Sequence, residues 1–406
     1  MTKFSLLSTL TALAISILLF PLNAYAQANT PDEKQTEFER AWYATCYTEK
    51  NDEKCYQLSK ELLAKYPSSA YGKNAGPIIK SRDLNNAWEK FKAALDAFYR
   101  QPPQDAAKLE GLFAAGNAFH QVEPDQQNPF HLFVLGQMAI AGNQAVSVVQ
   151  FYKSLDTVKG YAERAVKAFE IAQATEKTKK DFDLYVGPLK DLVMANANQF
   201  FGYRLIETKG DQQQALDYLT KATQIKSKDG VGWKDPYNYL LRSTIYFNQY
   251  TDIRKPYDAM TEEQKGSEAG KEVFKKINEY LDTKLIPEYA RVLATATKPE
   301  VKPYYDSAKN PFDVYWDFRT GAKEKAADYI KNYVADPTIS SVPVPAKAED
   351  TGNLNAPSAP TTAPGAVKLA SGTGTAPGGK SAANGNGKSA PPKGKQPAKG
   401  RKKRGG

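Results

Sequence analysis

The chain has 406 residues, and its 55 Lys and Arg against 45 Asp and Glu give a formal net charge of +10. The excess is local, because residues 341–406 hold 11 basic and two acidic residues, whereas residues 27–340 hold 43 of each. Charge therefore gives no argument that the body, residues 27–340, binds nucleic acid. The length of the body suits an elongated stack or two sub-domains better than one compact core.

The N-terminus has the features of a Sec-type signal peptide, residues 1–26. Lys3 precedes an uncharged, mostly apolar run from Phe4 to Phe20, and Ala24-Tyr25-Ala26 forms a small-x-small cleavage site. We expect cleavage after Ala26. The alternative is an uncleaved membrane anchor, although the run is short against the span of about 20 residues that a bilayer needs. The prediction is an exported protein, periplasmic or secreted.

Helix signals are frequent along the body, and strand-like alternation is essentially absent. Three helices are expected to begin with an Asn or Asp cap, a Pro at the first helical position and an inward aromatic residue. These starts are Asn128-Pro129-Phe130, Asp235-Pro236-Tyr237 and Asn310-Pro311-Phe312. Asp83 is the expected cap of another helix that runs through Arg100 and ends at Gln101-Pro102-Pro103. The predicted fold class is all-α.

Residues 196–229 carry a helix–turn–helix pattern. After a Gly210-Asp211 turn, Ala215, Leu219 and Ala222 form a small–large–small row at helical spacing. This pattern resembles a unit of the tetratricopeptide-repeat (TPR) family, in which helical hairpins stack into an α-solenoid. The first helix matches less well, because Gly202 and Tyr203 stand where the family prefers a large apolar and then a small residue.

Two further stretches resemble the same repeat. One begins at Pro129, with a turn at Gly142-Asn143 and then Ser147, Phe151 and Ser154 on the second helix. The other covers residues 36–69, with Trp42 and Tyr43 in its first helix, Asn51-Asp52 as its turn and Pro67 as its closing proline. The resemblance implies a TPR-like stack with degenerate repeats, and an unrelated array of helical hairpins is the alternative.

The two cysteines of the chain, Cys46 and Cys55, flank the Asn51-Asp52 turn. In the repeat register they fall at about the same height on the two helices of one hairpin, within disulfide range. An even pair in an exported protein favours a disulfide. Reduced, buried thiols are the main alternative, since no His lies nearby to complete a metal site and the spacing is not C-x-x-C.

The resemblance also implies a binding surface, because such repeats bind partner segments in a groove lined by their first helices. The corresponding groove residues are Phe133, Gln137, Ile140, Phe200, Arg204 and Glu207. We therefore expect a non-enzymatic scaffold in the bacterial envelope or the extracellular space, with a protein as its partner.

A second hypothesis is a glycan-binding protein or a helical enzyme acting on envelope polymer. Its platform would be the aromatic cluster between Tyr304 and Phe318, above all Tyr315 and Trp316. The competing interpretation is core packing, because the aromatic residues stand at helical spacing.

Sequence motifs of the common enzyme classes are absent, so no catalytic residue and no cofactor is expected. His120 and His131 bracket a Pro-containing loop, and a metal pair completed by Glu123 or Asp125 is the functional interpretation. Ordinary capping or packing histidines are favoured instead, and no metal is expected.

The tail, residues 341–406, is rich in Pro, Ala, Gly, Ser, Thr and Lys, a composition that predicts disorder. It ends in a basic run that contains Lys393, Lys395, Lys399, Arg401, Lys402, Lys403 and Arg404. The run favours either docking onto an anionic envelope surface or a solvated tail that keeps the protein soluble. Nucleic acid is disfavoured, because no aromatic residue is interleaved for base stacking. A third hypothesis is a tether that works through this tail.

Overall fold

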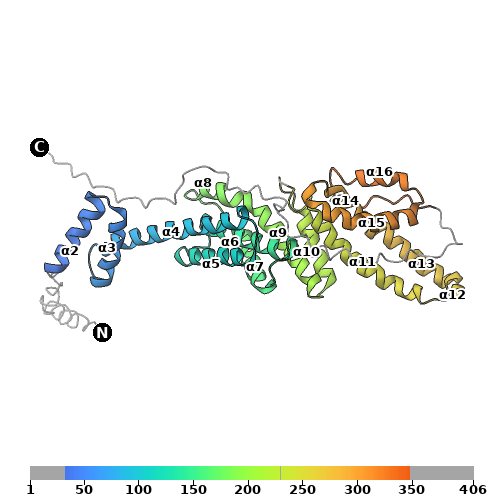
Figure 1. The fold of residues 1–406 in the computed structure, drawn as a ribbon, viewed down its shortest axis with the longest axis horizontal. Helices are drawn as coiled ribbons and strands as arrows, with labels where there is room; N and C mark the ends of the chain where they lie inside the picture. The colour runs from blue at the N-terminus through green and yellow to red at the C-terminus, as the bar shows by residue number, and fades with distance from the viewer. Residues whose placement is uncertain (1–32, 229, 348–406) are drawn as a thin grey trace, which may run out of the picture. The chain divides into compact units, whose positions relative to one another are not determined.

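The computed structural model describes residues 33–228 and 230–347, and this part of the chain is all-α (Figure 1). Its only β feature is an isolated bridge between Lys226 and Gly232. The described residues fall into two compact units, 33–83 and 84–347. The predicted signal peptide and the basic run lie outside the described residues.

The first unit is a helical hairpin stabilised by a disulfide. It contains α2 (Glu33–Tyr43), a π-helical turn η2 (Ala44–Thr48), α3 (Asp52–Lys65) and the start of α4 (Gly72–Arg100). Asn51 caps α3 by accepting a hydrogen bond from the backbone of Lys54. Cys46 and Cys55 form a disulfide with Cα atoms 4.9 Å apart, which confirms the predicted pairing.

The start of α4 corrects a prediction. The helix begins at Gly72, not after a cap at Asp83, and it ends at Arg100 as expected. Asp83 lies in the helix interior, where its carboxylate accepts a hydrogen bond of 2.5 Å from the hydroxyl of Tyr56 on α3. An Asp whose side chain bonds to another helix does not compete for its own backbone amides, so the helix continues through it.

The second unit begins with a group of helices around α6 (Pro129–Asn143), every residue of which is buried. Its neighbours are α5 (Ala106–Val122), α7 (Leu155–Ile171) and α9 (Gly187–Glu207). The cap at Asn128 is confirmed, since its side chain accepts from the backbone of Phe130. A helix that is apolar on all sides belongs in a core, and α6 is central for that reason.

The α6–α7 hairpin differs from its predicted register. The helical backbone continues through Gly142-Asn143 into a π-helical turn, η3 (Gln144–Val148), so the predicted inter-helix turn is wrong. Ser154 is the N-cap of α7 instead of lying within the second helix. Gly142 is needed for close packing, because a Cβ there would lie 3.0 Å from Val158 of α7.

The α9–α10 hairpin has the predicted turn. Asp211 caps α10 (Gln212–Gln224) and accepts a hydrogen bond of 2.9 Å from the backbone of Gln214. Ala215, Leu219 and Ala222 are all buried. A short helix α8 (Lys179–Asp181) and a π-helical turn η4 (Phe182–Val186) precede this hairpin.

The rest of the unit is a second helical group. Its long helices are α11 (Pro236–Asp258), α13 (Glu268–Tyr280), α14 (Ile286–Thr295) and α15 (Lys302–Thr320). Shorter elements are α12 (Glu262–Gly266), α16 (Ala326–Lys331), a π-helical turn η5 (Leu281–Leu285) and two 3-10 turns, η6 (Pro299–Val301) and η7 (Lys323–Lys325). Helix α14 packs against α11, α15 and α16.

Two details of this group bear on the predicted helix starts. Asp235 caps α11, as expected, by accepting from the backbone of Tyr237. Pro311 lies inside α15 and does not begin it, so the third predicted start is wrong. The helix starts nine residues earlier, at Lys302, where Pro303 occupies the position near the N-terminus that tolerates proline.

Residues 335–347, the C-terminal strap, follow α16 and pack back onto the second unit. Val342 accepts a hydrogen bond from the hydroxyl of Tyr329 and donates one to the hydroxyl of Tyr333. The backbone of Lys347 donates to the carbonyl of Arg319. The predicted start of the disordered tail at residue 341 is therefore too early, because residues 341–347 have fixed partners.

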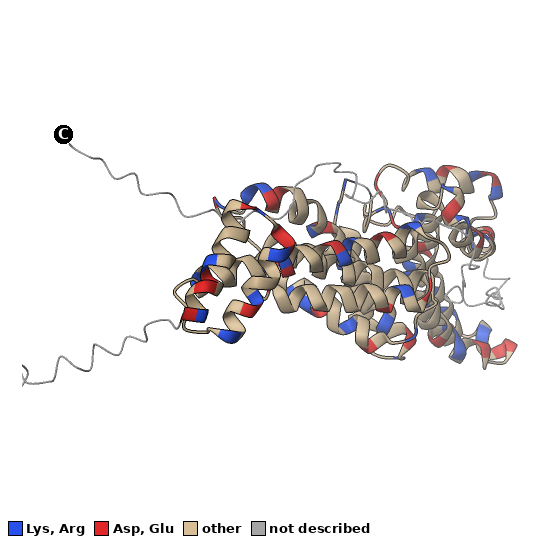
Figure 2. Ribbon diagram, turned by 60° about the vertical axis from the view of Figure 1, so that its left-hand side comes forward, with Lys and Arg blue, Asp and Glu red and all other residues tan. Residues whose placement is uncertain are grey.

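Within the described ranges, no helix is both long and apolar enough to cross a membrane. Figure 2 shows acidic and basic residues interspersed along the helices, in agreement with the balanced charge of the body.

Candidate binding sites

Most of the predicted groove residues lie in the core. Phe133, Gln137, Ile140 and Phe200 are each no more than 8% exposed, so the prediction that they line an open groove is wrong. The cause is the position of α6, which is covered on every side instead of presenting one face to a partner. Glu207 is exposed at the end of α9.

Arg204 does line a hollow, but on a different face. A cavity of about 360 Å³ lies between α7, α9 and α10. Its apolar lining consists of Val166, Phe201, Leu205 and Tyr218, which are all partly exposed. The rings of Phe201 and Tyr218 meet with their centroids 5.2 Å apart. We call this the α7/α9/α10 hollow.

Charged residues of both signs surround the apolar lining of this hollow. They are Lys159, Glu163, Lys167, Glu170 and Arg204. Lys159 pairs with Glu163 on α7, and Arg204 pairs with Asp156 at 3.0 Å. A partner side chain entering the hollow would therefore meet an apolar surface with a mixed polar rim, the usual anatomy of a protein–protein contact.

The predicted aromatic platform is also part of the core. Tyr315 is 0% and Trp316 is 1% exposed, so the platform hypothesis for these residues is wrong. The indole nitrogen of Trp316 donates to the carbonyl of Ala322 at 2.9 Å, and Tyr315 packs against Tyr250 and Tyr289. Burial raises the pKa of Tyr315. These side chains close the core instead of offering a surface to a sugar.

The two histidines form a packed pair. Their rings stack with centroids 3.9 Å apart, and His131 Nδ1 lies 2.8 Å from the carbonyl of Glu123. Burial and the neighbouring His131 lower the pKa of His120 to about 4. Within residues 33–228 and 230–347 no group of three or more His, Cys, Asp or Glu is arranged to hold a metal ion.

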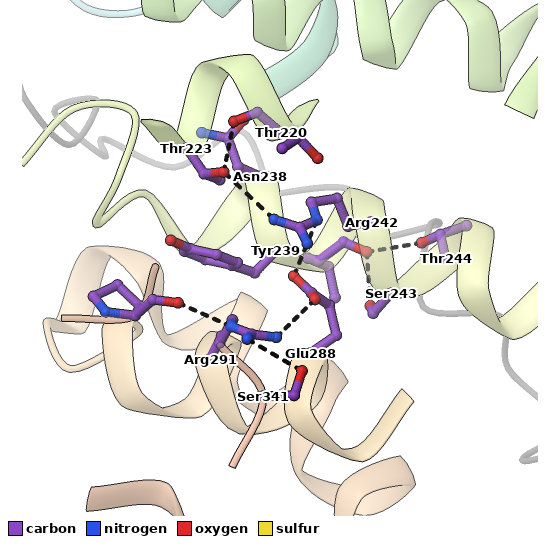
Figure 3. A network of polar contacts seen from close by, with 12 residues as sticks. Thr220, Thr223, Asn238, Tyr239, Arg242, Ser243, Thr244, Glu288, Arg291 and Ser341 are labelled. Atoms are coloured by element: carbon purple, nitrogen blue, oxygen red, sulfur yellow. Dashed lines mark hydrogen bonds and ion pairs between the residues drawn. The ribbon is translucent and has the colours of Figure 1, made fainter. Parts of the chain in front are cut away.

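A second hollow contains a buried charged network that the sequence analysis did not single out (Figure 3). It has a volume of about 240 Å³ and is lined by α10, α11, η5, α14 and the C-terminal strap. Glu288 of α14 is 1% exposed and lies between two arginines, Arg242 of α11 and Arg291 of α14. We call this the Arg242/Arg291 pocket.

The two arginines of this pocket have different surroundings. Arg291 is fully engaged: it donates to Glu288 at 3.1 Å and to the strap carbonyls of Pro337 and Ile339 at 2.9 Å each. Its guanidinium also lies over the ring of Tyr333, 4.8 Å from the centroid. Arg291 therefore holds the strap against α14.

Arg242 makes only long contacts to the rest of the network. Its Nε lies 3.3 Å from Glu288 Oε1, and its Nη1 lies 3.4 Å from Thr223 Oγ1. The contact to Glu288 is an ion pair without hydrogen-bond alignment, since neither atom has a hydrogen-bond partner among the described residues. Burial lowers the pKa of Arg242, but Glu288 and Tyr246 raise it, and the net shift is upward.

A helical pattern alone does not reveal this pocket. Glu288 and Arg291 are three residues apart on α14, a spacing that is common on solvated helices. Their partner Arg242 lies on another helix, and the strap crosses the predicted boundary between the body and the tail at residue 341. One signal was present: Arg291 stands between Ala290 and Val292-Leu293 in the sequence, and an arginine is unusual in such an apolar stretch.

No protein-family model, no curated protein and no solved structure matches this chain.

Proposed function

We propose that this protein is a non-enzymatic binding scaffold with TPR-like hairpins, and that it holds a segment of a partner protein in the α7/α9/α10 hollow. The observation that carries the proposal is the partly exposed apolar lining of Val166, Phe201, Leu205 and Tyr218 at the meeting of three helices. Aromatic residues in such a setting are the usual anchors of protein recognition.

The charge pattern around the hollow supports a polypeptide as the occupant. The rim carries both signs, with Lys167 and Glu170 on α7 beside the apolar lining. A segment with one apolar or aromatic anchor and flanking charged residues complements this rim. Purely anionic polymers suit it less, because Glu163 and Glu170 would repel them.

The proposal also includes the compartment in which the protein works and a role for its basic tail. The signal-peptide features of residues 1–26 and the Cys46–Cys55 disulfide both suit an oxidising compartment, the periplasm or the extracellular space. The basic run from Lys393 to Arg404 would add an electrostatic attraction to an anionic envelope surface, which salt weakens.

The experiment is site-specific photo-crosslinking in the native envelope. A photoreactive phenylalanine derivative replaces Tyr218 in the hollow, and in a control protein it replaces Leu184, a 44% exposed residue of η4. We expect a discrete crosslinked protein from position 218 and none of the same mass from position 184.

A second variant tests whether the hollow itself makes the contact. Val166→Asp places a charge in the apolar lining and should abolish the crosslink from position 218. The proposal fails if positions 218 and 184 give the same products, or if Val166→Asp leaves the crosslink unchanged while the protein stays folded.

A further inference from the structure

The Arg242/Arg291 pocket has an excess of positive charge. Its lining contains Arg242, Arg291 and Lys284 against the single carboxylate of Glu288. The side chains of Arg242, Arg291 and Glu288 are 15%, 7% and 1% exposed. One carboxylate does not neutralise two buried guanidinium groups, so the pocket keeps a net positive charge that attracts an anion.

Arg319, in the same unit, has the paired hydrogen bonds to a carboxylate that Arg242 lacks. It donates two parallel hydrogen bonds to Asp282, from Nε to Oδ1 at 2.8 Å and from Nη2 to Oδ2 at 2.7 Å. That is the fork-to-fork geometry typical of arginine with a carboxylate. Arg242, with contacts of 3.3 and 3.4 Å, has no such partner among the described residues, although it faces the cavity. Its guanidinium is thus the buried cation of the pocket that is available to an oxyanion, and the exposed Lys284 lies in the same lining.

The remaining lining suits a hydroxylated ligand. It contains six hydroxyl groups, which come from Thr220, Thr223, Thr283, Thr338, Ser340 and Ser341. Those of Thr223, Thr283, Thr338 and Ser341 already donate to protein oxygens, so toward a ligand they are acceptors. Glu288 Oε1, which has no hydrogen-bond partner among the described residues, accepts only. A ligand that complements all of these groups carries an oxyanion and several hydroxyls.

The size of the pocket limits the ligand. Its volume of about 240 Å³ corresponds to roughly eight water molecules at about 30 Å³ each. It is also smaller than the roughly 300–1,000 Å³ of sites for drug-sized molecules. A polymer chain does not fit within it, whereas one sugar ring does.

We propose that the Arg242/Arg291 pocket binds a monosaccharide that carries an oxyanion group, either a carboxylate or a phosphate. Arg242 binds the oxyanion, and Glu288 with the surrounding hydroxyls accepts hydrogen bonds from the sugar hydroxyls. Arg291 acts through the strap, because its bonds to Pro337 and Ile339 hold one wall of the pocket in place. This site is separate from the α7/α9/α10 hollow and does not depend on the function proposed for it.

Isothermal titration of the full chain with three probes tests the proposal. The probes are glucuronate, glucose 6-phosphate and neutral glucose. We expect saturable binding of at least one of the two acidic probes and none of glucose. Binding of glucuronate alone assigns the carboxylate as the recognised group, and binding of glucose 6-phosphate alone assigns the phosphate.

Three variants connect the binding to the pocket. Arg242→Gln should weaken it about tenfold to hundredfold, because a charge-assisted bond is lost. Lys255→Gln removes one positive charge from an exposed, ion-paired position on the same helix and should leave the affinity unchanged. If Arg242→Gln does not fold, Thr223→Val keeps the charge, removes one hydroxyl of the lining and should weaken binding severalfold.

Two results would overturn the proposal. One is the absence of binding by both acidic probes up to roughly 10 mM, which is weaker than any specific small-ligand site needs to be. The other is binding that Arg242→Gln and Lys255→Gln weaken equally, or that Thr223→Val leaves unchanged where Arg242→Gln does not fold. Either result would restrict the charged network to holding the C-terminal strap.

Discussion

Gly202 of α9 and Leu219 of α10 approach so closely that a Cβ on Gly202 would lie 2.6 Å from Leu219 Cγ. This contact brings the two helices of the hairpin together, and Leu219 is fully buried against the glycine. Gly202 is one of the two positions at which the first helix departs from the repeat pattern, and the absence of a side chain there lets the two helices approach.

Gly202→Ala should therefore destabilise the protein despite the better helix propensity of alanine. Overpacking of a tight core contact costs about 1–3 kcal/mol. The control is Gly160→Ala on α7, where nothing lies within 4 Å of the added Cβ. That variant should be neutral or stabilising by about 0.5–1 kcal/mol. Thermal or urea unfolding of both variants measures the difference, and equal effects would contradict the packing argument.

Removal of the Cys46–Cys55 bond should weaken the first unit alone. The loop is short, with a sequence separation of 9. The chain-entropy model gives a loss of about 2.5–3 kcal/mol. In Cys46→Ser/Cys55→Ser, amide hydrogen exchange should accelerate in α3, while α10 of the second unit keeps its protection. Equal acceleration in α3 and α10 would show that the two units unfold together.

The histidine pair should make stability depend on pH. The folded pKa of His120, near 4, lies below the ordinary value of 6.5, so the folded state binds this proton less tightly than the unfolded state. The contribution of His120 is complete above about pH 6.5 and is lost as the pH falls through about 4. Between roughly pH 7.5 and pH 4.5, wild type should lose more stability than His120→Gln.

Other groups enter the same comparison. His131 and Arg164 act on His120, and Glu123 and Asp125 act on His131. The difference between wild type and His120→Gln measures the contribution of His120 together with its coupling to His131, because the two rings are in contact. Identical losses of stability on acidification would rule that contribution out.

The packing of the C-terminal strap onto the second unit should depend more on the buried contacts of Arg291 than on the exposed ion pair of Lys226. Arg291→Gln removes three donors to Glu288, Pro337 and Ile339 and leaves a buried carboxylate less well paired, a change worth about 3–5 kcal/mol. Lys226→Ala removes an exposed ion pair with Asp336, worth about 0–1 kcal/mol.

Limited proteolysis measures the strap directly. Cleavage within residues 335–347 should become much faster in Arg291→Gln and change little in Lys226→Ala. The assignment of Arg291 as the anchor of the strap would be contradicted if both variants were cleaved at the wild-type rate.

Many features that depend on local chemistry could be predicted from the sequence. The caps at Asn128 and Asp235, the turns at Gly210-Asp211 and Asn51-Asp52, and the disulfide follow from residue types at short spacing, and the structure has each of them. The expected helix starts at Asp83 and Pro311 follow the same rules and are wrong, because both residues lie inside longer helices. The all-α class follows from the same signals, because helix punctuation and periodicity are local properties.

Features that depend on the packing of distant elements were not predictable in this way. Gly142 is a residue type typical of turns, but here it lies in a helix and allows Val158 of another helix to pack closely against it. Phe133 and Phe200 were expected to line an open groove, but both are buried in the core. Arg242 and Arg291 lie on helices of ordinary composition, and only tertiary structure brings both to Glu288.

The most direct test of the proposed function is the affinity of the partner recovered by crosslinking from position 218. It should be titrated against a protein of residues 27–406, the truncation 27–347 that keeps the strap, and the pair Tyr218→Ala and Leu184→Ala. We predict at least about tenfold weaker binding for Tyr218→Ala, the loss typical of an aromatic anchor, with Leu184→Ala and the truncation close to wild type. Equal binding by both substitution variants, or binding that disappears with residues 348–406, would contradict recognition through the α7/α9/α10 hollow.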